Sequence, residues 1–257
     1  MSALLRMEFG KLVRLGSLRF SLLLLVIFPL LWSYAPGIFD VYGFYLVSGY
    51  QVPALGLLSS MEFLLPLLVA ITSAELLGIE MSYGTLPTIL LRPVSRSRWL
   101  LAKLIVSSLY PFLLLLFLLL VSLITGAFYG YGSFVGGTGL GAGGILGEGL
   151  MQPAPALAEI VWAYAVAAIS LIPISLLAVL FTVMFMSAAG GALATLGTLI
   201  AMKLLVVFPA IEPYLLTSQL SSYVAPVAGM GWVVLLIFVY CTAFAVAAVV
   251  LFERKDF

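Results

Sequence analysis

The chain alternates between long apolar runs and short polar segments. Six runs are long and continuous enough to cross a membrane, at about residues 20–35, 54–79, 100–125, 159–186, 192–208 and 232–252. A helix needs about 20 apolar residues to cross the roughly 30 Å hydrocarbon core of a bilayer. Backbone groups in lipid must pair internally, and continuous runs lack the alternation of barrel strands. The pattern therefore predicts an all-α integral membrane protein with six transmembrane helices.

The segment before the first run has a different pattern. Over about residues 3–16, apolar and charged side chains alternate at helical spacing. The apolar positions are Leu4, Leu5, Phe9, Leu12 and Val13, and the charged positions are Arg6, Glu8, Lys11 and Arg14. This pattern is typical of an interfacial helix that lies flat on the membrane with its apolar side down. The alternative is a polar tail before the first span.

Two of the connecting segments are also informative. The stretch from Pro209 to Met230, between the fifth and sixth runs, is too apolar for a free loop and too short for two full spans. It predicts short re-entrant or interfacial helices. The glycine-rich stretch from Gly126 to Ala158, between the third and fourth runs, is interpreted as a flexible surface loop.

Composition supports a membrane protein with little room for anything else. Of the 257 residues, 64% are hydrophobic and only 8% are charged, whereas a soluble domain carries about 25% charged residues. We therefore treat residues 1–257 as a single transmembrane domain. A net charge of +1 provides no basic field for nucleic acid. With no histidine and the single cysteine Cys241, zinc, redox and Ser-His chemistry are excluded.

The positive charges predict the orientation. Cytoplasmic loops of membrane proteins are enriched in Lys and Arg. Basic residues precede the first run, flank the connection between the second and third runs, and follow the sixth run: Arg6, Lys11, Arg14, Arg19, Arg92, Arg96, Arg98, Lys103, Arg254 and Lys255. The connections between runs one and two, three and four, and five and six carry none, and Lys203 lies inside the fifth run. Both termini are therefore predicted to be cytoplasmic.

The sequence matches one nucleotide-binding motif and lacks another. Gly139, Gly141 and Gly144 match G-x-G-x-x-G, but that fingerprint needs a strand before it and a helix after it in a soluble domain, so we interpret the match as accidental. The chain also lacks G-x-x-x-x-G-K-[ST], the loop that holds ATP phosphates. No cofactor is expected in this chain.

Four ionisable residues lie within or near the predicted spans: Glu62, Glu75, Lys203 and Glu212. A charge at mid-membrane costs at least about 2.5 kcal/mol, so such residues are candidates for intramembrane polar contacts. Glu62 and Lys203 are expected near the outer end and Glu75 near the inner end. The favoured interpretation is structural, with Lys203 snorkelling or pairing with Glu62 or Glu212. Contact with a transported substrate is the alternative.

The connection between the second and third runs has the most specific pattern. It runs from Glu80 to Lys103, and an apolar stretch is followed by a basic turn. An apolar patch flanked by charges predicts a docking site for lipid or protein. The segment resembles the type-2 family of ATP-binding-cassette (ABC) permeases, on these residues: Glu80, Gly84, Thr85, Leu90, Leu91, Pro93, Val94, Ser95, Arg96 and Lys103. The ending from Phe252 to Asp256 is also similar to that of the family.

The resemblance implies that the chain is a permease subunit in the cell membrane. It also implies that the transporter is an exporter. It implies a coupling helix from Glu80 to Leu91 that docks a separate ATPase subunit, which binds ATP and Mg, and it implies pairing with a second permease copy or a related permease. The residues it assigns to coupling are Glu80, Tyr83, Gly84, Thr85, Leu86, Leu90, Leu91, Pro93, Ser95 and Arg96. Membrane lipid is a further expected partner. The alternatives are a membrane-embedded enzyme or assembly factor, and a secondary transporter; the expected marks of a secondary transporter, inverted repeats and buried charge relays, are not seen.

Overall fold

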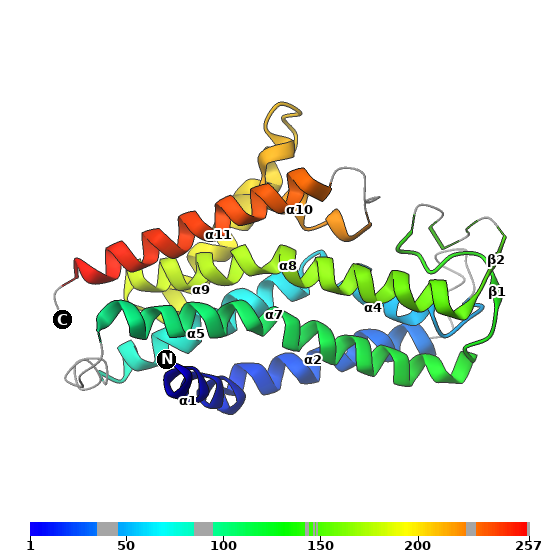
Figure 1. Cartoon of the computed structure of the whole chain (residues 1–257), viewed down its shortest axis with the longest axis horizontal. Helices are drawn as coiled ribbons and strands as arrows, with labels where there is room; N and C mark the ends of the chain where they lie inside the picture. The colour runs from blue at the N-terminus through cyan, green and yellow to red at the C-terminus, as the bar shows by residue number, and fades with distance from the viewer. Residues whose placement is uncertain are drawn as a thin grey trace.

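The computed structural model describes residues 1–34, 46–84, 95–141, 144–145, 147, 149–224 and 230–255. The long helices are α1 (Ser2–Arg14), α2 (Gly16–Tyr34), α4 (Gln51–Met61), α5 (Leu64–Ser82), α7 (Arg96–Gly126), α8 (Pro153–Phe185), α9 (Ala188–Leu205) and α11 (Met230–Glu253). Figure 1 shows both termini at one end of the bundle, which we call the terminal end. The opposite end, which carries strands β1 and β2, is called the hairpin end.

Six helices are long and apolar enough to cross a membrane, as the sequence predicts: α2, α5, α7, α8, α9 and α11. The predicted boundaries are off by a few residues. α7 begins at Arg96 and α8 at Pro153, both earlier than expected. Proline is common at the first position of a helix, because an N–H there has no intrahelical partner and its absence costs nothing. Pro153 was therefore a signal for the earlier start of α8.

The second apolar run is not one helix. It is divided into α4 and α5 at Glu62 and Phe63, and the backbone of Phe63 is non-helical, with φ −142° and ψ −47°. Pro66 provides the physical reason. A helix that continued through this point would need an N–H at Pro66 to bond the Glu62 carbonyl, and proline has none. The predicted single span over 54–79 is therefore corrected to two helices.

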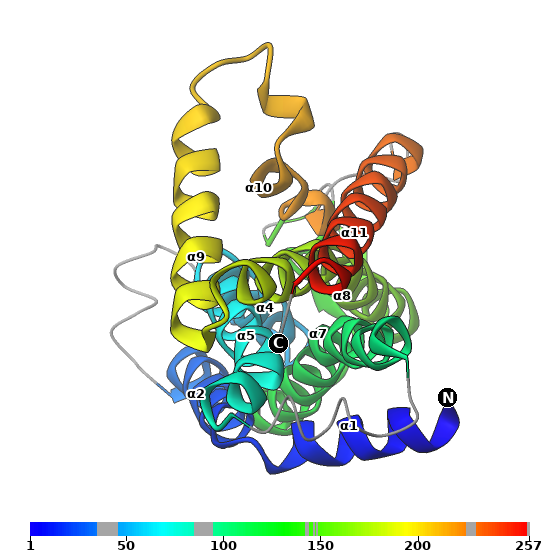
Figure 2. The same cartoon turned by 90° about the vertical axis from the view of Figure 1, so that its left-hand side faces the viewer.

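α8 forms the centre of the bundle. Its most apolar stretch is 83% buried, against 17% for α9 and 11% for α11. At mid-bundle the Tyr110 hydroxyl is within hydrogen-bond distance of Thr72 Oγ1 (2.9 Å) and Ser21 Oγ (3.1 Å), which ties α7 to α5 and α2. Hydroxyl contacts of this kind hold helices together where both lipid and protein are apolar. Figure 2 shows α9 and α11 diverging from the bundle.

Small residues bring α5, α8 and α9 together near the terminal end. A Cβ added at Gly78 of α5 would overlap Ala188 at the start of α9, and one at Gly191 would overlap Thr182 of α8. The turn between α8 and α9 is tight, with Met186 in the left-handed region (φ 56°). The packing role predicted for the small residues at this turn agrees with these contacts.

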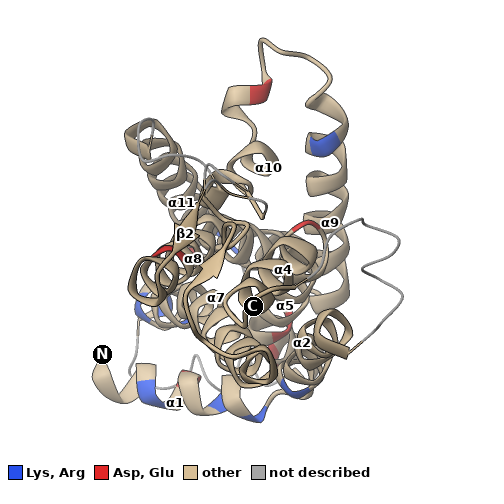
Figure 3. Ribbon diagram, turned by 90° about the vertical axis from the view of Figure 1, so that its right-hand side faces the viewer, with Lys and Arg blue, Asp and Glu red and all other residues tan. Residues whose placement is uncertain are grey.

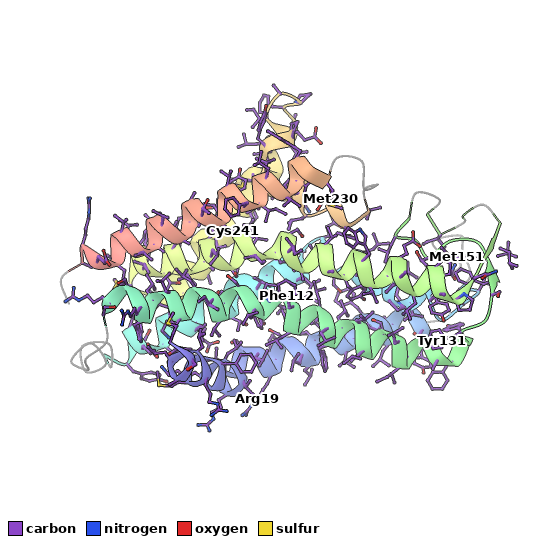
Figure 4. The ribbon with its side chains drawn as sticks, viewed as in Figure 1. Arg19, Phe112, Tyr131, Met151, Met230 and Cys241 are labelled. Carbon is purple, nitrogen blue, oxygen red and sulfur yellow. The ribbon has the colours of Figure 1, made fainter. Side chains whose placement is uncertain are left out.

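The described part of the glycine-rich segment contains a short strand pair, which the predicted loop did not include. Strands β1 (Phe134–Val135) and β2 (Leu150–Met151) pair antiparallel, with Phe134 opposite Met151. The Thr138 hydroxyl donates to Glu159 Oε2 of α8 at 2.6 Å, and Gln51 Nε2 of α4 donates to the Gly137 carbonyl at 3.1 Å. Figure 4 shows Tyr131 and Met151 together at this end, with Arg19 toward the other.

Short helical turns connect α9 to α11. They are η2 (Glu212–Tyr214), α10 (Leu216–Gln219) and η3 (Ser222–Val224), and η1 (Ala127–Tyr129) follows α7. The predicted short helices between the fifth and sixth spans are therefore present. Leu216 is fully buried, so the segment packs against the protein and is not a free loop. Its depth in the membrane stays a prediction.

Candidate functional site

Helix α1 lies across the terminal end of the bundle (Figure 2). Its inward face differs from the predicted one, because Glu8 is fully buried together with Leu12, whereas Phe9 and Val13 are exposed. The amphipathic pattern predicted the helix, but it placed Glu8 on the polar side. The partners of Glu8 on α5 and α7 explain the difference.

Four charged side chains meet where α1, α5 and α7 converge, and we call them the charge cluster: Glu8, Lys11, Glu80 and Lys103. Lys103 Nζ lies 2.8 Å from Glu8 Oε2 and 3.2 Å from Glu80 Oε2. Lys11 Nζ pairs with Glu8 at 2.6 Å and also with Glu80. Each cation thus contacts both anions, and the cluster is neutral. Figure 3 shows that the ribbon is mostly tan, with blue concentrated along α1.

Lys103 is the most demanding member of the cluster because its side chain has no exposed surface. It also donates to the Leu76 carbonyl at 2.7 Å, and its Nζ lies 4.9 Å from the centre of the Trp99 ring. A buried charge is tolerated only when it is paired and its donors are satisfied. A cation over an aromatic ring adds about 0.5–2 kcal/mol of attraction. These contacts hold α1, the end of α5 and the start of α7 in one arrangement.

The pKa of Lys11 reflects the same contacts. Partial burial acts to lower this pKa, but hydrogen bonds and charge attraction from Glu8 and Glu80 outweigh it and raise the pKa above the ordinary 10.5. Lys11 is therefore protonated at neutral pH and bridges the two carboxylates.

A second set of contacts fixes the end of α11 to α7 and α8, and we call it the C-terminal clamp: Arg96, Trp99, Phe252 and Lys255. Lys255 Nζ donates to the carbonyls of Val183 and Met184, both at 2.7 Å. These are among the last carbonyls of α8, where a cation is favourable because they lack helical partners. Arg96 donates to the Lys255 carbonyl at 3.1 Å, and Trp99 stacks on Phe252 at 5.4 Å between ring centroids.

The residues predicted to couple to an ATPase fall into two groups. Thr85, Leu86, Leu90, Leu91 and Pro93 lie outside the described residues. The other five flank that segment.

Tyr83 is 79% exposed, Gly84 has φ +63°, and Ser95 is the N-cap of α7. Glu80 and Arg96 instead form contacts within the protein, in the charge cluster and the C-terminal clamp. Sequence reasoning did not identify Glu8 and Lys255 as site residues. The position of Lys255 just after α11 could have indicated its role, because a cation there can reach the last carbonyls of a neighbouring helix.

The predicted intramembrane polar residues do not form one site. Lys203 Nζ of α9 lies 3.3 Å from Glu62 Oε1, at the break between α4 and α5. Glu75 is half-buried in α5, and Glu212 is exposed in η2. Of the two partners considered for Lys203, the structure provides Glu62. Among the described residues, no three His, Cys, Asp or Glu side chains could hold a metal ion together.

These features define a multi-pass helical membrane protein whose first and last helices, α1 and α11, both reach the terminal end of the bundle. A family model described as ABC-2 family transporter protein matches residues 4–183, from α1 almost to the end of α8. The chain belongs to this family, so it is a multi-pass permease component of an ABC transporter in the cell membrane. No curated protein matches the chain.

Proposed function

We propose that the chain is the permease of an ATP-driven exporter, with its terminal end in the cytoplasm. Family membership supports a transport role alongside ABC ATPase subunits. The sequence contains no phosphate-binding loop, so ATP and Mg²⁺ belong to the ATPase subunit. The positive charges at the terminal end support the cytoplasmic side, and the outward direction follows the family resemblance.

The coupling segment is proposed to run from Tyr83 to Ser95, including the five predicted residues that the structure does not describe. The observation that carries this proposal is the anchoring of both ends of the segment. Before it, Glu80 is held by Lys11 and Lys103. After it, Arg96 is held by the end of α11. A force on the segment therefore reaches α1, α5, α7 and α11 through fixed contacts.

This anchoring changes the role proposed for Glu80 and Arg96. Their side chains are occupied by the charge cluster and the C-terminal clamp, so their part in coupling is to transmit motion. Direct contact with the ATPase falls to Tyr83 and the residues that follow it. Packed interiors have discrete arrangements, so the charge cluster, in which Glu8 and Lys103 are fully buried, is suited to transmitting a closure motion.

A second copy of the chain is proposed to complete the transporter. Few residues of α9 and α11 are buried within the chain, and Leu193 and Leu204 of α9 are each about two thirds exposed. These faces are available for lipid or for a second permease. Light scattering of the solubilised complex, corrected for detergent, distinguishes one copy from two.

Replacing Tyr83 by Asp tests the docking assignment. The substitution places a charge on an exposed aromatic side chain, so the fold is expected to persist while the ATPase subunit is lost from the purified complex. An interface aromatic typically contributes about 2 kcal/mol or more, a loss of about thirtyfold in affinity. The measurement is the amount of ATPase subunit that co-purifies with the tagged permease.

Phe128→Asp is the matched control. Phe128 is 76% exposed, close to the value for Tyr83, and lies in η1 at the hairpin end. The same chemical change there should leave the ATPase bound. Full retention of the ATPase by Tyr83→Asp, or equal loss with both variants, would show that the docking assignment is wrong.

A further inference from the structure

A cavity of about 400 Å³ lies between the break in the second run, the outer half of α9 and the short helices that follow it. Its apolar wall includes Leu58 and Met61 of α4, Leu199 of α9 and Leu220 beyond α10. Sites for small molecules have volumes of about 300–1,000 Å³ and mostly apolar walls. In Figure 2, α9 leaves the bundle and α10 lies on the segment that returns toward it.

The cavity also carries a pair of opposite charges. Glu62 and Lys203 both line it, and their side chains are 78% and 57% exposed. An exposed ion pair contributes only about 0–1 kcal/mol. Lys203 is the only charged residue of α9, and Glu62 is exposed because Pro66 interrupts the helix there. The pair is therefore easily opened, and each member can exchange its partner for a ligand group.

Polar groups deeper in the wall point to the same kind of ligand. The Thr217 hydroxyl oxygen is buried and has no hydrogen-bond partner within the part of the chain that the structure describes. A buried hydroxyl without a partner costs about 1–3 kcal/mol, which a ligand hydrogen bond would recover. Burial, and then the negative charge of Glu62, raise the pKa of the nearby Tyr223 to about 12, so its hydroxyl stays neutral.

We propose that this cavity binds a single-chain amphiphile with a zwitterionic headgroup. The alkyl chain fills the apolar space between α4 and α9. The anionic part of the headgroup pairs with Lys203, and the cationic part pairs with Glu62. The Thr217 hydroxyl bonds a polar group of the ligand. Binding does not require the ATPase, and only the status of the ligand as exported cargo rests on the proposed function.

The test measures equilibrium binding of radiolabelled dodecylphosphocholine to the full chain, held in the non-ionic detergent dodecyl maltoside. The wild type is expected to bind the probe saturably, with one site in each chain. Ile200→Trp fills the cavity from its α9 wall, and it should weaken binding by about tenfold or more, because the indole ring occupies space that the alkyl chain needs. Ile200 is 57% exposed, so the protein should tolerate the larger side chain.

Leu204→Trp is the matched control, since Leu204 is 70% exposed on α9 but does not line the cavity. This variant should bind the probe within about twofold of the wild type. The proposal is overturned if binding of the probe does not saturate. It is also overturned if Ile200→Trp and Leu204→Trp weaken binding equally.

A second arm tests the charge pair with dodecyl phosphate and dodecyltrimethylammonium as competitors. Lys203→Met leaves Glu62 alone, so the cationic competitor should become the stronger one. Glu62→Gln leaves Lys203 alone, so the anionic competitor should become the stronger one. A purely structural ion pair would not reverse the preference, and unchanged competition in both variants overturns the zwitterion assignment.

The outcome is separable from that of the proposed function. Normal probe binding by a chain that never retains an ATPase subunit would contradict the export proposal and leave the binding site supported. An ATPase complex that forms normally around a chain without saturable probe binding would contradict only the binding site.

Discussion

At the residue scale, the Lys103 and Glu8 side chains pair at 2.8 Å, and neither has any exposed surface. Removing one partner of a buried pair typically costs about 3–5 kcal/mol, because the remaining charge stays buried. The charge cluster avoids this cost by giving each carboxylate two cations. The N-terminal helix is thus held by specific pairing as well as by its apolar residues.

Lys11 provides a prediction about alkaline stability. Its pKa is above 10.5 in the folded chain, so protonated Lys11 stabilises the fold fully below pH 10.5. This stabilisation is lost as the pH rises through the raised pKa. Lys11→Met should therefore lower the free energy of unfolding near pH 8, and the difference from the wild type should shrink above pH 10.5. Unfolding titrations with sodium dodecyl sulfate at both pH values measure it.

Other groups also titrate in this range, so the comparison needs a control away from the charge cluster. Lys203→Met serves this purpose, because Lys203 lies on α9 away from the charge cluster, and its ion pair with Glu62 is exposed and therefore contributes little to stability. Its difference from the wild type should not follow the Lys11 pattern. A Lys11→Met difference that stays constant with pH would contradict the role given to the Lys11 charge.

The sequence could predict only part of this chemistry. Charges at the terminal end were visible, and Glu80 and Lys103 were recognisable from their family pattern. The pairing of Glu8 was not predictable, because helical periodicity places it beside Lys11 on the polar face. Its burial depends on Lys103, which is 95 residues away in the sequence, and local periodicity carries no information about that distance.

At the element scale, α5 and α9 approach each other so closely that only glycine fits at position 78. Gly78→Ala should lower the free energy of unfolding by about 1–3 kcal/mol, because the added methyl group overlaps Ala188. The same substitution at Gly197 meets no atom within 4 Å. Gly197→Ala should stabilise the helix by about 0.5–1 kcal/mol. Unfolding titrations of the two variants should therefore show opposite signs.

If both glycine variants change the free energy of unfolding in the same direction, the close contact between α5 and α9 is wrong.

The existence of the six spans was predictable from hydropathy alone. The division into α4 and α5 was less accessible, although Pro66 was present in the sequence. Pro29, Pro111 and Pro173 lie inside continuous helices, so proline alone does not decide where a helix ends.

At the scale of the whole molecule, the prediction concerns sidedness. Both termini lie at one end and the β hairpin at the other (Figure 1). In a Cys241→Ala background, Leu150→Cys should react with a membrane-impermeant maleimide in intact cells, since Leu150 is 68% exposed on β2. Tyr83→Cys, at 79% exposure, should react only after permeabilisation. The reverse pattern would invert the assigned orientation.

The unequal burial of the spans has a consequence for biosynthesis. α5, α7 and α8 bury much of their apolar surface against the rest of the chain, whereas α9 and α11 bury little of theirs. Domains generally fold from the N-terminus as the chain leaves the ribosome. We therefore expect the tightly packed part to assemble once residue 185 has been inserted. α9 and α11 would then join a finished scaffold, and they remain the helices most dependent on the surrounding bilayer during maturation.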